Sequence, residues 1–185
     1  MKKVIVIFSS KRGSTKRYAE WIAEDLDCEA VSFEEIEKIN LYEYDCIIYG
    51  GWIRGSGIVN FDKFSKYLHE EILQKLVVFG VGIAYPSAEN YMQVWNFSIG
   101  KIDPRNDNRV LLYILEGSYN PMNITGLDKL LMYVMKKVLI SGSTKDSQSE
   151  ARKMQDRIES GTNLVKRENI QGIVRDARAI LNEEK

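Results

Sequence analysis

Histidine and cysteine are scarce in this chain, which has one His and two Cys among its 185 residues. No group of His, Cys and carboxylate residues stands at the spacing that metal ligands need, so we do not expect a metal site. The two cysteines, Cys28 and Cys46, lie in or beside predicted strands. This position favours two buried thiols over a disulfide.

An excess of one charge and long apolar runs are also missing. The chain has 26 basic and 26 acidic residues, and this balance argues against nucleic acid as the main partner. No apolar run approaches the length of a membrane span. The run after Lys2 and Lys3 is too short for a signal peptide. We therefore expect a cytoplasmic protein in which residues 1–185 form a single domain.

The most informative stretch is an apolar run that leads through a polar turn into a helix. Val4 to Phe8 are five apolar residues, mostly β-branched, as in a strand buried on both faces of a parallel sheet. Apolar residues then recur at helical spacing over 18–26. The turn between them combines hydroxyl groups, positive charge and one glycine, in Ser10, Lys11, Arg12, Gly13, Ser14 and Thr15. Such a turn at a helix N-terminus is suited to binding a phosphate.

Several known kinds of phosphate site need residues that this turn lacks. A P-loop or a dinucleotide fingerprint needs more glycines than Gly13 alone. A cysteine-based phosphatase needs a thiol in the turn, and a receiver domain needs acidic residues after the first strand; the turn has neither. An ordinary helix N-cap that binds nothing remains the alternative.

Further apolar patterns predict the remaining elements. Three short runs are typical of buried strands, and they cover 45–49, 76–81 and 110–115. An alternating run predicts an edge strand over 29–33. Amphipathic spacing predicts helices over 61–72, 88–99, 149–158 and 170–181. Strands at intervals of roughly forty residues with helices between them predict an α/β fold with a doubly wound parallel sheet.

Two of the strands run into turns that contain glycine. Residues 50–57 hold four glycines in eight positions, so the backbone there either adopts positive φ or lets another group approach closely. Residues 82–87 form the other glycine-containing turn. Because ligands of open α/β sheets bind at the carboxyl ends of the strands, we expect both turns beside the phosphate turn. For residues 50–57, the alternative is a flexible loop with an exposed Trp52.

The phosphate turn resembles the flavodoxin phosphate loop, [ST]-x-[ST]-G-x-T. Ser10, Gly13 and Thr15 match this pattern, and Arg12 stands where the family usually has a hydroxyl residue. The resemblance implies FMN held by its terminal phosphate. It also implies a flavodoxin-like five-stranded parallel sheet in the order 2-1-3-4-5, with helices on both faces and FMN at the switch between the first and third strands.

Three features together resemble one branch of these proteins, the menaquinone-dependent protoporphyrinogen oxidases and their relatives. They are the stretch 8–15, the Gly50-x-x-Ile53-Arg54 turn, and a fifth strand followed by Tyr119-Asn120-Pro121 and a Leu/Met/Lys helix. In that branch an organic substrate reduces the flavin and a quinone reoxidises it. The segment after the fifth strand lies near the substrate and the membrane.

The flavodoxin resemblance also implies roles at the three turns. The phosphate would contact residues 10–15. The flavin ring would be flanked by Gly51, Trp52, Ile53 and Arg54, with Trp52 stacking on it and Arg54 beside its reduced, anionic form. The pyrimidine edge would be lined by Gly82, Ile83 and Ala84, and Tyr85 would stack on the exposed face. No side chain is an obvious general acid or base, so we name no catalytic residue.

An extended helical segment, about 119–160, is expected after the fifth strand. Within it, residues 126–139 are apolar on nearly every side of a predicted helix, and Lys129, Lys136 and Lys137 occupy the remainder. Packing on the sheet explains this pattern. Contact with a partner subunit, an apolar substrate or a membrane surface explains it as well, so peripheral membrane contact stays open.

These observations predict an FMN-binding oxidoreductase that passes electrons between an organic donor and a quinone-like acceptor. The balanced charge and the apolar helix favour an enzyme acting on small molecules. A flavodoxin-type electron carrier that docks on a redox protein is the first alternative. A cofactor-less interaction module of flavodoxin shape is the second.

Overall fold

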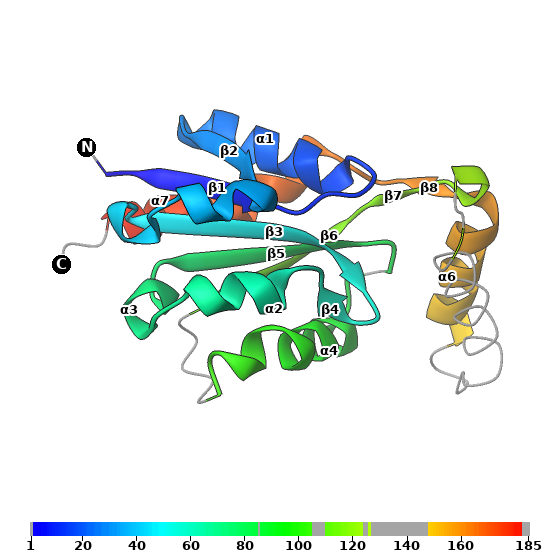
Figure 1. Ribbon diagram of the computed structural model, residues 1–185. Helices are drawn as coiled ribbons and strands as arrows, with labels where there is room; N and C mark the ends of the chain where they lie inside the picture. Colours follow the sequence, from blue (N-terminus) through cyan, green and yellow to red (C-terminus); the bar gives the residue numbers. More distant parts are fainter. Residues whose placement is uncertain (1, 85, 105–109, 124–125, 127–147, 183–185) are drawn as a thin grey trace.

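The computed structural model describes residues 2–84, 86–104, 110–123, 126 and 148–182. Its centre is a parallel sheet (Figure 1) with the strand order β2 (Glu29–Ser32), β1 (Val4–Phe8), β3 (Cys46–Arg54), β5 (Leu76–Gly82) and β6 (Leu111–Glu116). A short strand, β4 (Gly57–Ile58), pairs antiparallel with the end of β3. The predicted order 2-1-3-4-5 is confirmed, because β5 and β6 are the fourth and fifth parallel strands.

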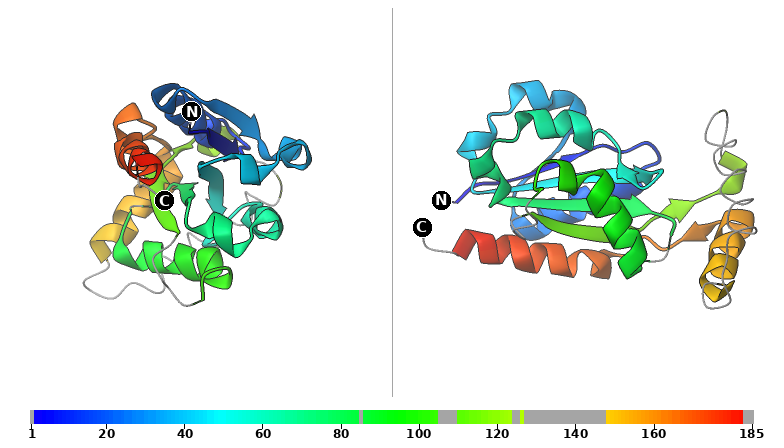
Figure 2. Two further views of the ribbon diagram at one scale, coloured as in Figure 1. Left: turned by 90° about the vertical axis from the view of Figure 1, so that its left-hand side faces the viewer. Right: turned by 90° about the horizontal axis from the view of Figure 1, so that it is seen from below.

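Helices cover both faces of the sheet (Figures 1 and 2). One face carries α1 (Ser14–Leu26) and α7 (Gln171–Asn182), the latter preceded by η6 (Arg167–Ile170). The other face carries η1 (Phe33–Lys38), η2 (Leu41–Glu43), α2 (Phe61–Phe64), η3 (Ser65–Tyr67), α3 (Glu70–Leu73), α4 (Ala88–Phe97) and η4 (Ile99–Lys101). The predicted α/β architecture with helices on both faces is therefore confirmed.

The side chains of each central strand alternate between the two hydrophobic cores. In β1, Ile5 and Ile7 join the core beneath α2 and α4, while Val6 joins the core beneath α1 and α7. In β3, Ile47 and Ile48 divide in the same way, and both are fully buried. Burial on both faces explains why these strands are continuous apolar runs in the sequence.

The helix predicted over 61–72 is wrong as one element. The chain forms two four-residue helices, α2 and α3, with η3 between them, and His69 lies in extended backbone before α3. The broken path still buries Phe61, Phe64 and Ile72 against the sheet. An apolar stripe at helical spacing is thus satisfied by short pieces that each place one or two side chains in the core.

The described part of the segment after β6 extends beyond the carboxyl edge of the sheet (Figures 1 and 2). A two-stranded antiparallel ribbon, β7 (Ser118–Tyr119) with β8 (Thr162–Asn163), joins it to the main body. It also contains η5 (Pro121–Asn123) and α6 (Gln148–Ser160), so the predicted helix over 149–158 is confirmed. The predicted helix over 126–139, apart from Gly126, lies outside the described residues.

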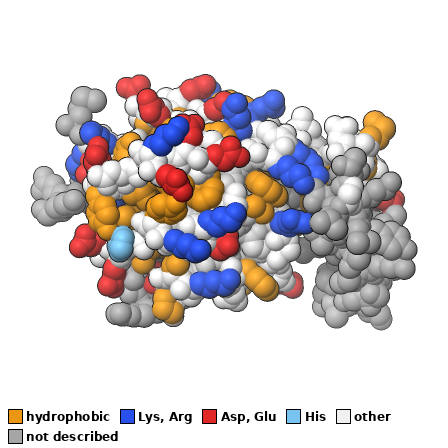
Figure 3. All heavy atoms as spheres, viewed as in Figure 1, with side chains coloured by type: hydrophobic (Ala, Val, Ile, Leu, Met, Phe, Trp, Pro, Cys, Tyr) orange, Lys and Arg blue, Asp and Glu red, His pale blue; other side chains and the backbone are white. Residues whose placement is uncertain are grey.

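The described residues show mixed charge and no membrane-spanning helix. Among them, none of the helices combines the length and apolarity that crossing a membrane requires. Basic and acidic side chains are interspersed on the face viewed in Figure 3, in keeping with the balanced composition.

Cys28 and Cys46 are both free thiols, and burial raises their pKa to about 11 and about 12.

Candidate functional site

The register of the parallel strands brings the three predicted turns to one edge of the sheet. Phe8 pairs with Gly50, and Gly51 pairs with Gly80. On the next strand pair, Gly82 lies opposite Glu116. The strands β1, β3, β5 and β6 therefore end side by side, and the chain segments that follow them share the carboxyl edge.

The first turn presents backbone donors at the start of a long helix. Gly13 is the N-cap of α1 with φ 91°, and no side chain caps the helix. The first hydrogen bond of the helix runs from the Arg17 N–H to the Gly13 carbonyl, at 2.9 Å. The helix itself therefore provides no acceptor for the N–H groups of Ser14, Thr15 and Lys16. These groups, with the positive end of the helix dipole, form an arrangement that favours an anion.

The space around this turn is compatible with a phosphate. A Cβ atom built on Gly13 would meet nothing within 4 Å, and Lys11, Arg12 and Gly13 are exposed. The positive φ of Gly13 is a conformation that other residues rarely adopt, which explains the glycine at this position. The turn thus combines open space, helix donors and two cationic side chains, features that favour a bound phosphate.

The hydroxyl groups of the turn have different surroundings. The Ser10 hydroxyl accepts a hydrogen bond from the Gly13 N–H, at 3.2 Å. The Ser14 hydroxyl accepts one from the Ser118 N–H, at 3.2 Å, and so ties the turn to β7. Thr15 is only 2% exposed. Burial raises the pKa of Tyr119 in β7, and the positive charge of Arg12 partly offsets this rise.

A buried polar cluster contacts the residue that precedes the first turn, Ser9. The Ser9 hydroxyl shares a hydrogen bond with the Tyr49 hydroxyl, at 3.2 Å, and accepts one from the Asn60 side-chain amide, at 3.1 Å. Tyr49 also donates to the Val59 carbonyl, at 2.9 Å, and burial raises the pKa of Tyr49. The cluster connects the start of the first turn to the segment that follows β4.

The second turn is shorter than the sequence predicts. The apolar pattern predicts a third strand that ends at Tyr49, but β3 continues to Arg54 and pairs with β4 through Ile53 and Ile58. The turn itself is Gly55–Ser56, with φ 55° and 67°. Positive φ at both central residues is characteristic of the type I′ turn that matches the twist of a two-stranded hairpin.

Close packing accounts for two of the four glycines in this region. A Cβ on Gly50 would lie 2.1 Å from the Phe79 ring, and a Cβ on Gly51 would lie 2.6 Å from the Ile58 side chain. The groups that approach these glycines belong to the protein itself. The prediction that residues 50–57 form one loop is therefore wrong, because residues 50–54 belong to β3 and Gly57 belongs to β4.

The residues of the hairpin that were predicted to contact the flavin differ in how far they are exposed. Trp52 and Ile53 are half-buried, and Arg54 is exposed. The Ile53 side chain lies over Gly80 and Gly82, where a Cβ would be 2.9 Å and 3.4 Å from it. Ile53 therefore packs on the protein, whereas Trp52 and Arg54 stay candidates for contact with a bound molecule.

The third turn is fixed by backbone contacts to its neighbours. The Gly117 N–H donates to the Gly82 carbonyl, at 2.6 Å. Gly82, Ile83 and Ala84 are half-buried. Tyr85, the predicted stacking residue, lies outside the described residues. Ser87 is the N-cap of α4, and its hydroxyl accepts from the Asn90 N–H, at 3.2 Å.

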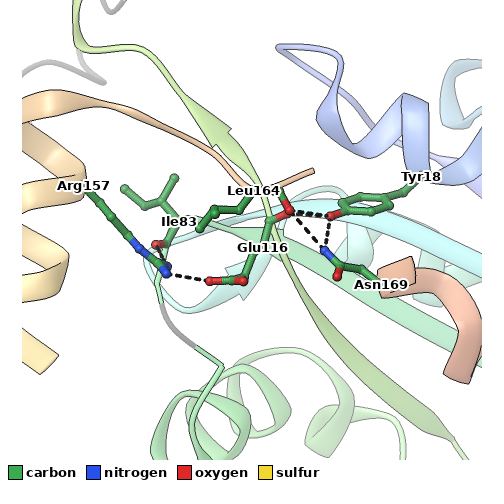
Figure 4. A network of polar contacts seen from close by, with 6 residues as sticks. All are labelled: Tyr18, Ile83, Glu116, Arg157, Leu164 and Asn169. Carbon is green, nitrogen blue, oxygen red and sulfur yellow. Dashed lines mark hydrogen bonds and ion pairs between the residues drawn. The ribbon is translucent and has the colours of Figure 1, made fainter. Parts of the chain in front are cut away.

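Sequence reasoning missed a polar network that joins α6, β6 and α1 (Figure 4). Arg157 of α6 forms a partly buried ion pair with Glu116, at 2.7 Å, and also donates to the Ile83 carbonyl, at 3.0 Å. Tyr18 donates to the Glu116 carbonyl, at 2.7 Å, and accepts from the Asn169 amide, at 2.8 Å. Of these residues, only Tyr18 could have indicated such a network in the sequence, because a tyrosine on a buried helix face needs a hydrogen-bond partner for its hydroxyl.

Comparison with known proteins places this geometry in a family. No curated protein matches the sequence. Among solved structures, a flavodoxin from the domain Archaea has 18% identity, covering 85% of this chain and 97% of that one, with a TM-score of 0.41. The Trp repressor binding protein from Bacillus subtilis has 16% identity, covering 89% and 99%, with a TM-score of 0.42.

A third solved structure is described with its cofactor. This flavoprotein from Lactobacillus acidophilus, in complex with FMN, has 14% identity, covering 63% of this chain and 93% of that one, with a TM-score of 0.39. The family model described as "Flavodoxin domain" matches residues 5–148, which include all three turns. A match of this extent supports FMN as the cofactor. It also shows the family, and this chain belongs to the flavodoxin domain family.

Proposed function

We propose that the protein is an FMN-dependent oxidoreductase that oxidises an organic donor and reduces a quinone-like acceptor. One observation carries the proposal: the uncapped N-terminus of α1 lies at the same edge of the sheet as the β3–β4 hairpin and the turn after β5. A phosphate site and two turns suited to a planar ring thus share one rim, at the position where doubly wound sheets bind nucleotides.

The residues of the chain would bind and orient the cofactor. The N–H groups of Ser14, Thr15 and Lys16 would hold the phosphate, with Lys11 and Arg12 adding positive charge. Bound FMN supplies the redox chemistry, and the protein supplies position and electrostatics.

The ring would lie between the second and third turns. Trp52 offers an aromatic surface for stacking. The exposed guanidinium of Arg54 would attract negative charge on the ring. The backbone of Gly82 to Ala84 would line the pyrimidine edge. No side chain of the rim is assigned as a proton donor, because electrons can pass directly between the cofactor and a substrate that contacts it.

The quinone-like acceptor rests on the resemblance to the menaquinone-dependent protoporphyrinogen oxidase branch. The Ile53-Arg54 pair and the long segment after β6 support it. The resemblance also motivates contact of residues 126–139 with a membrane surface, which flotation with liposomes would test. A flavodoxin-type carrier remains the alternative if the acceptor is a protein.

Two measurements test the proposal in sequence. The purified protein should absorb in the flavin bands, and heat should release FMN into the supernatant. After anaerobic reduction, a soluble menaquinone analogue should reoxidise the protein rapidly without a protein partner. Absence of flavin after incubation with FMN would contradict the whole proposal. Reoxidation only by small redox proteins would replace the enzyme with a carrier.

A further inference from the structure

Arg157 extends from α6 to the carboxyl ends of β5 and β6, where it contacts Ile83 and Glu116 (Figure 4). One guanidinium nitrogen, Nη1, donates to the carbonyl of Ile83, at 3.0 Å, and the other, Nη2, pairs with Glu116, at 2.7 Å. The Arg157 and Glu116 side chains are only 20% and 25% exposed. The planar fork of arginine can serve two such acceptors at fixed angles, which a lysine ammonium cannot reproduce.

This contact fixes the orientation of one peptide in the third turn. The described residues contain no cis peptide bond, so the Ile83–Ala84 peptide is trans and planar. In a trans peptide the C=O and the following N–H point in opposite directions. Since the Ile83 carbonyl points to Arg157, the Ala84 N–H points away from α6. It donates no hydrogen bond to any residue that the structure describes.

The same ion pair is connected to the helix of the phosphate turn. The Glu116 carboxylate accepts from Arg157, and the Glu116 carbonyl accepts from the Tyr18 hydroxyl, at 2.7 Å. Tyr18 is fully buried on α1, the helix that begins at Ser14. Glu116 therefore links the third turn to the element that presents the phosphate donors.

We propose that Arg157 is a positioning residue of the flavin site: it holds the Ile83 carbonyl and so aims the Ala84 N–H at the pyrimidine edge of FMN. The inference rests on the proposed function and adds to it, because it makes cofactor binding depend on α6, outside the three turns. A hydrogen bond to that edge strengthens when the reduced flavin carries negative charge there. Arg157 would therefore favour the reduced cofactor over the oxidised one.

The test compares Arg157→Met with a matched control on the same helix, Arg152→Met, whose side chain is exposed. FMN affinity is measured by fluorescence quenching, and the reduction potential of the bound flavin is measured by dye equilibration. Arg157→Met should raise the Kd for oxidised FMN about tenfold, the effect of about 1.4 kcal/mol. It should raise the Kd for reduced FMN more, so the potential becomes more negative. Arg152→Met should change neither.

A lysine variant separates position from charge. Arg157→Lys keeps the positive charge but lacks the fork, so we expect its potential to resemble that of Arg157→Met. Full recovery in Arg157→Lys would overturn positioning in favour of charge alone. Equal loss of both affinities with an unchanged potential would overturn it in favour of a merely structural role.

A measurement without cofactor keeps the two proposals distinguishable. In the apo protein, amide hydrogen exchange at Gly117, whose N–H donates to the Gly82 carbonyl of the third turn, should be faster in Arg157→Met than in Arg152→Met, while exchange in β1 stays the same. If the wild-type protein binds no FMN, both proposals fail. If the wild-type protein binds FMN and the two variants match in every readout, only the role of Arg157 fails.

Discussion

The first turn and the β3–β4 hairpin lie at the same edge of the sheet, but glycine serves them differently. In the first turn, Gly13 adopts φ 91° beside open space. In β3, Gly50 and Gly51 are strand residues whose missing side chains make room for Phe79 and Ile58. The first turn depends on a local backbone conformation, and so does the tip of the hairpin, where Gly55 has φ 55° beside open space; β3 depends in addition on close packing against Phe79 and Ile58. The first turn thus leaves space for a ligand, whereas the space beside Gly50 and Gly51 is filled by the protein itself.

The largest expected effect concerns the ligand side of this comparison. The double substitution Ser10→Ala with Thr15→Ala removes two hydroxyl groups of the phosphate turn. We expect FMN binding to weaken by about 2–4 kcal/mol, from two lost hydrogen bonds to a charged group. Isothermal titration measures the effect, with Ser65→Ala as the control because the Ser65 hydroxyl bonds to Asp62 in α2. Unchanged affinity in the double variant would mean that these two hydroxyl groups do not contact the phosphate.

Overpacking of β3 should produce the next largest effect. Gly50→Ala places a Cβ 2.1 Å from the Phe79 ring, so the ring or the strand has to move. We expect the free energy of unfolding to fall by about 2–3 kcal/mol. Urea denaturation measures it, with Gly57→Ala as the control because a Cβ there meets its nearest atom at 3.8 Å. Equal stability of the two variants would contradict the packing role of Gly50.

At Gly13, the stability of the protein should depend on the backbone conformation and not on the size of the side chain. Gly13→Ala gains no clash, yet its positive φ is costly for alanine, so we expect a loss of about 1–2 kcal/mol in the free energy of unfolding. Gly13→Asn should lose less, because asparagine tolerates this region better. The same urea measurements rank the variants. A larger loss in Gly13→Asn than in Gly13→Ala would indicate a steric limit instead.

The smallest expected effect concerns the contact between the two regions. Tyr49→Phe removes the hydroxyl that bonds to Ser9 and to the Val59 carbonyl. We expect a loss of about 1 kcal/mol in stability. The control is Tyr42→Phe, because Tyr42 is 54% exposed. A weaker FMN affinity in Tyr49→Phe than in this control would show that the cluster positions the phosphate turn. Equal affinity would restrict the cluster to stability.

The sequence predicted those features that depend on neighbouring residues. The apolar run of β1 and the helical spacing of α1 predicted both elements and the turn between them, because burial on two faces or on one stripe leaves a local pattern. The hairpin escaped prediction, because the glycines at 50 and 51 look like loop residues until Phe79 and Ile58 are seen against them.

The polar network shows the same limit at longer range. Arg157 is separated from Glu116 by 41 residues and from Ile83 by 74 residues. In the sequence it is one of several charged residues in a polar helix, and nothing nearby distinguishes it. A contact of this kind arises only when the ribbon of β7 and β8 brings α6 to the ends of the central strands.

The central claim is that backbone donors at the start of α1 hold the phosphate of FMN. Titration of the apo protein with FMN and with riboflavin, which lacks only the phosphate, tests it most directly. We predict that riboflavin binds at least about a hundredfold more weakly, the effect of about 2.7 kcal/mol from lost charge-assisted hydrogen bonds. Equal affinity for the two compounds would contradict the claim.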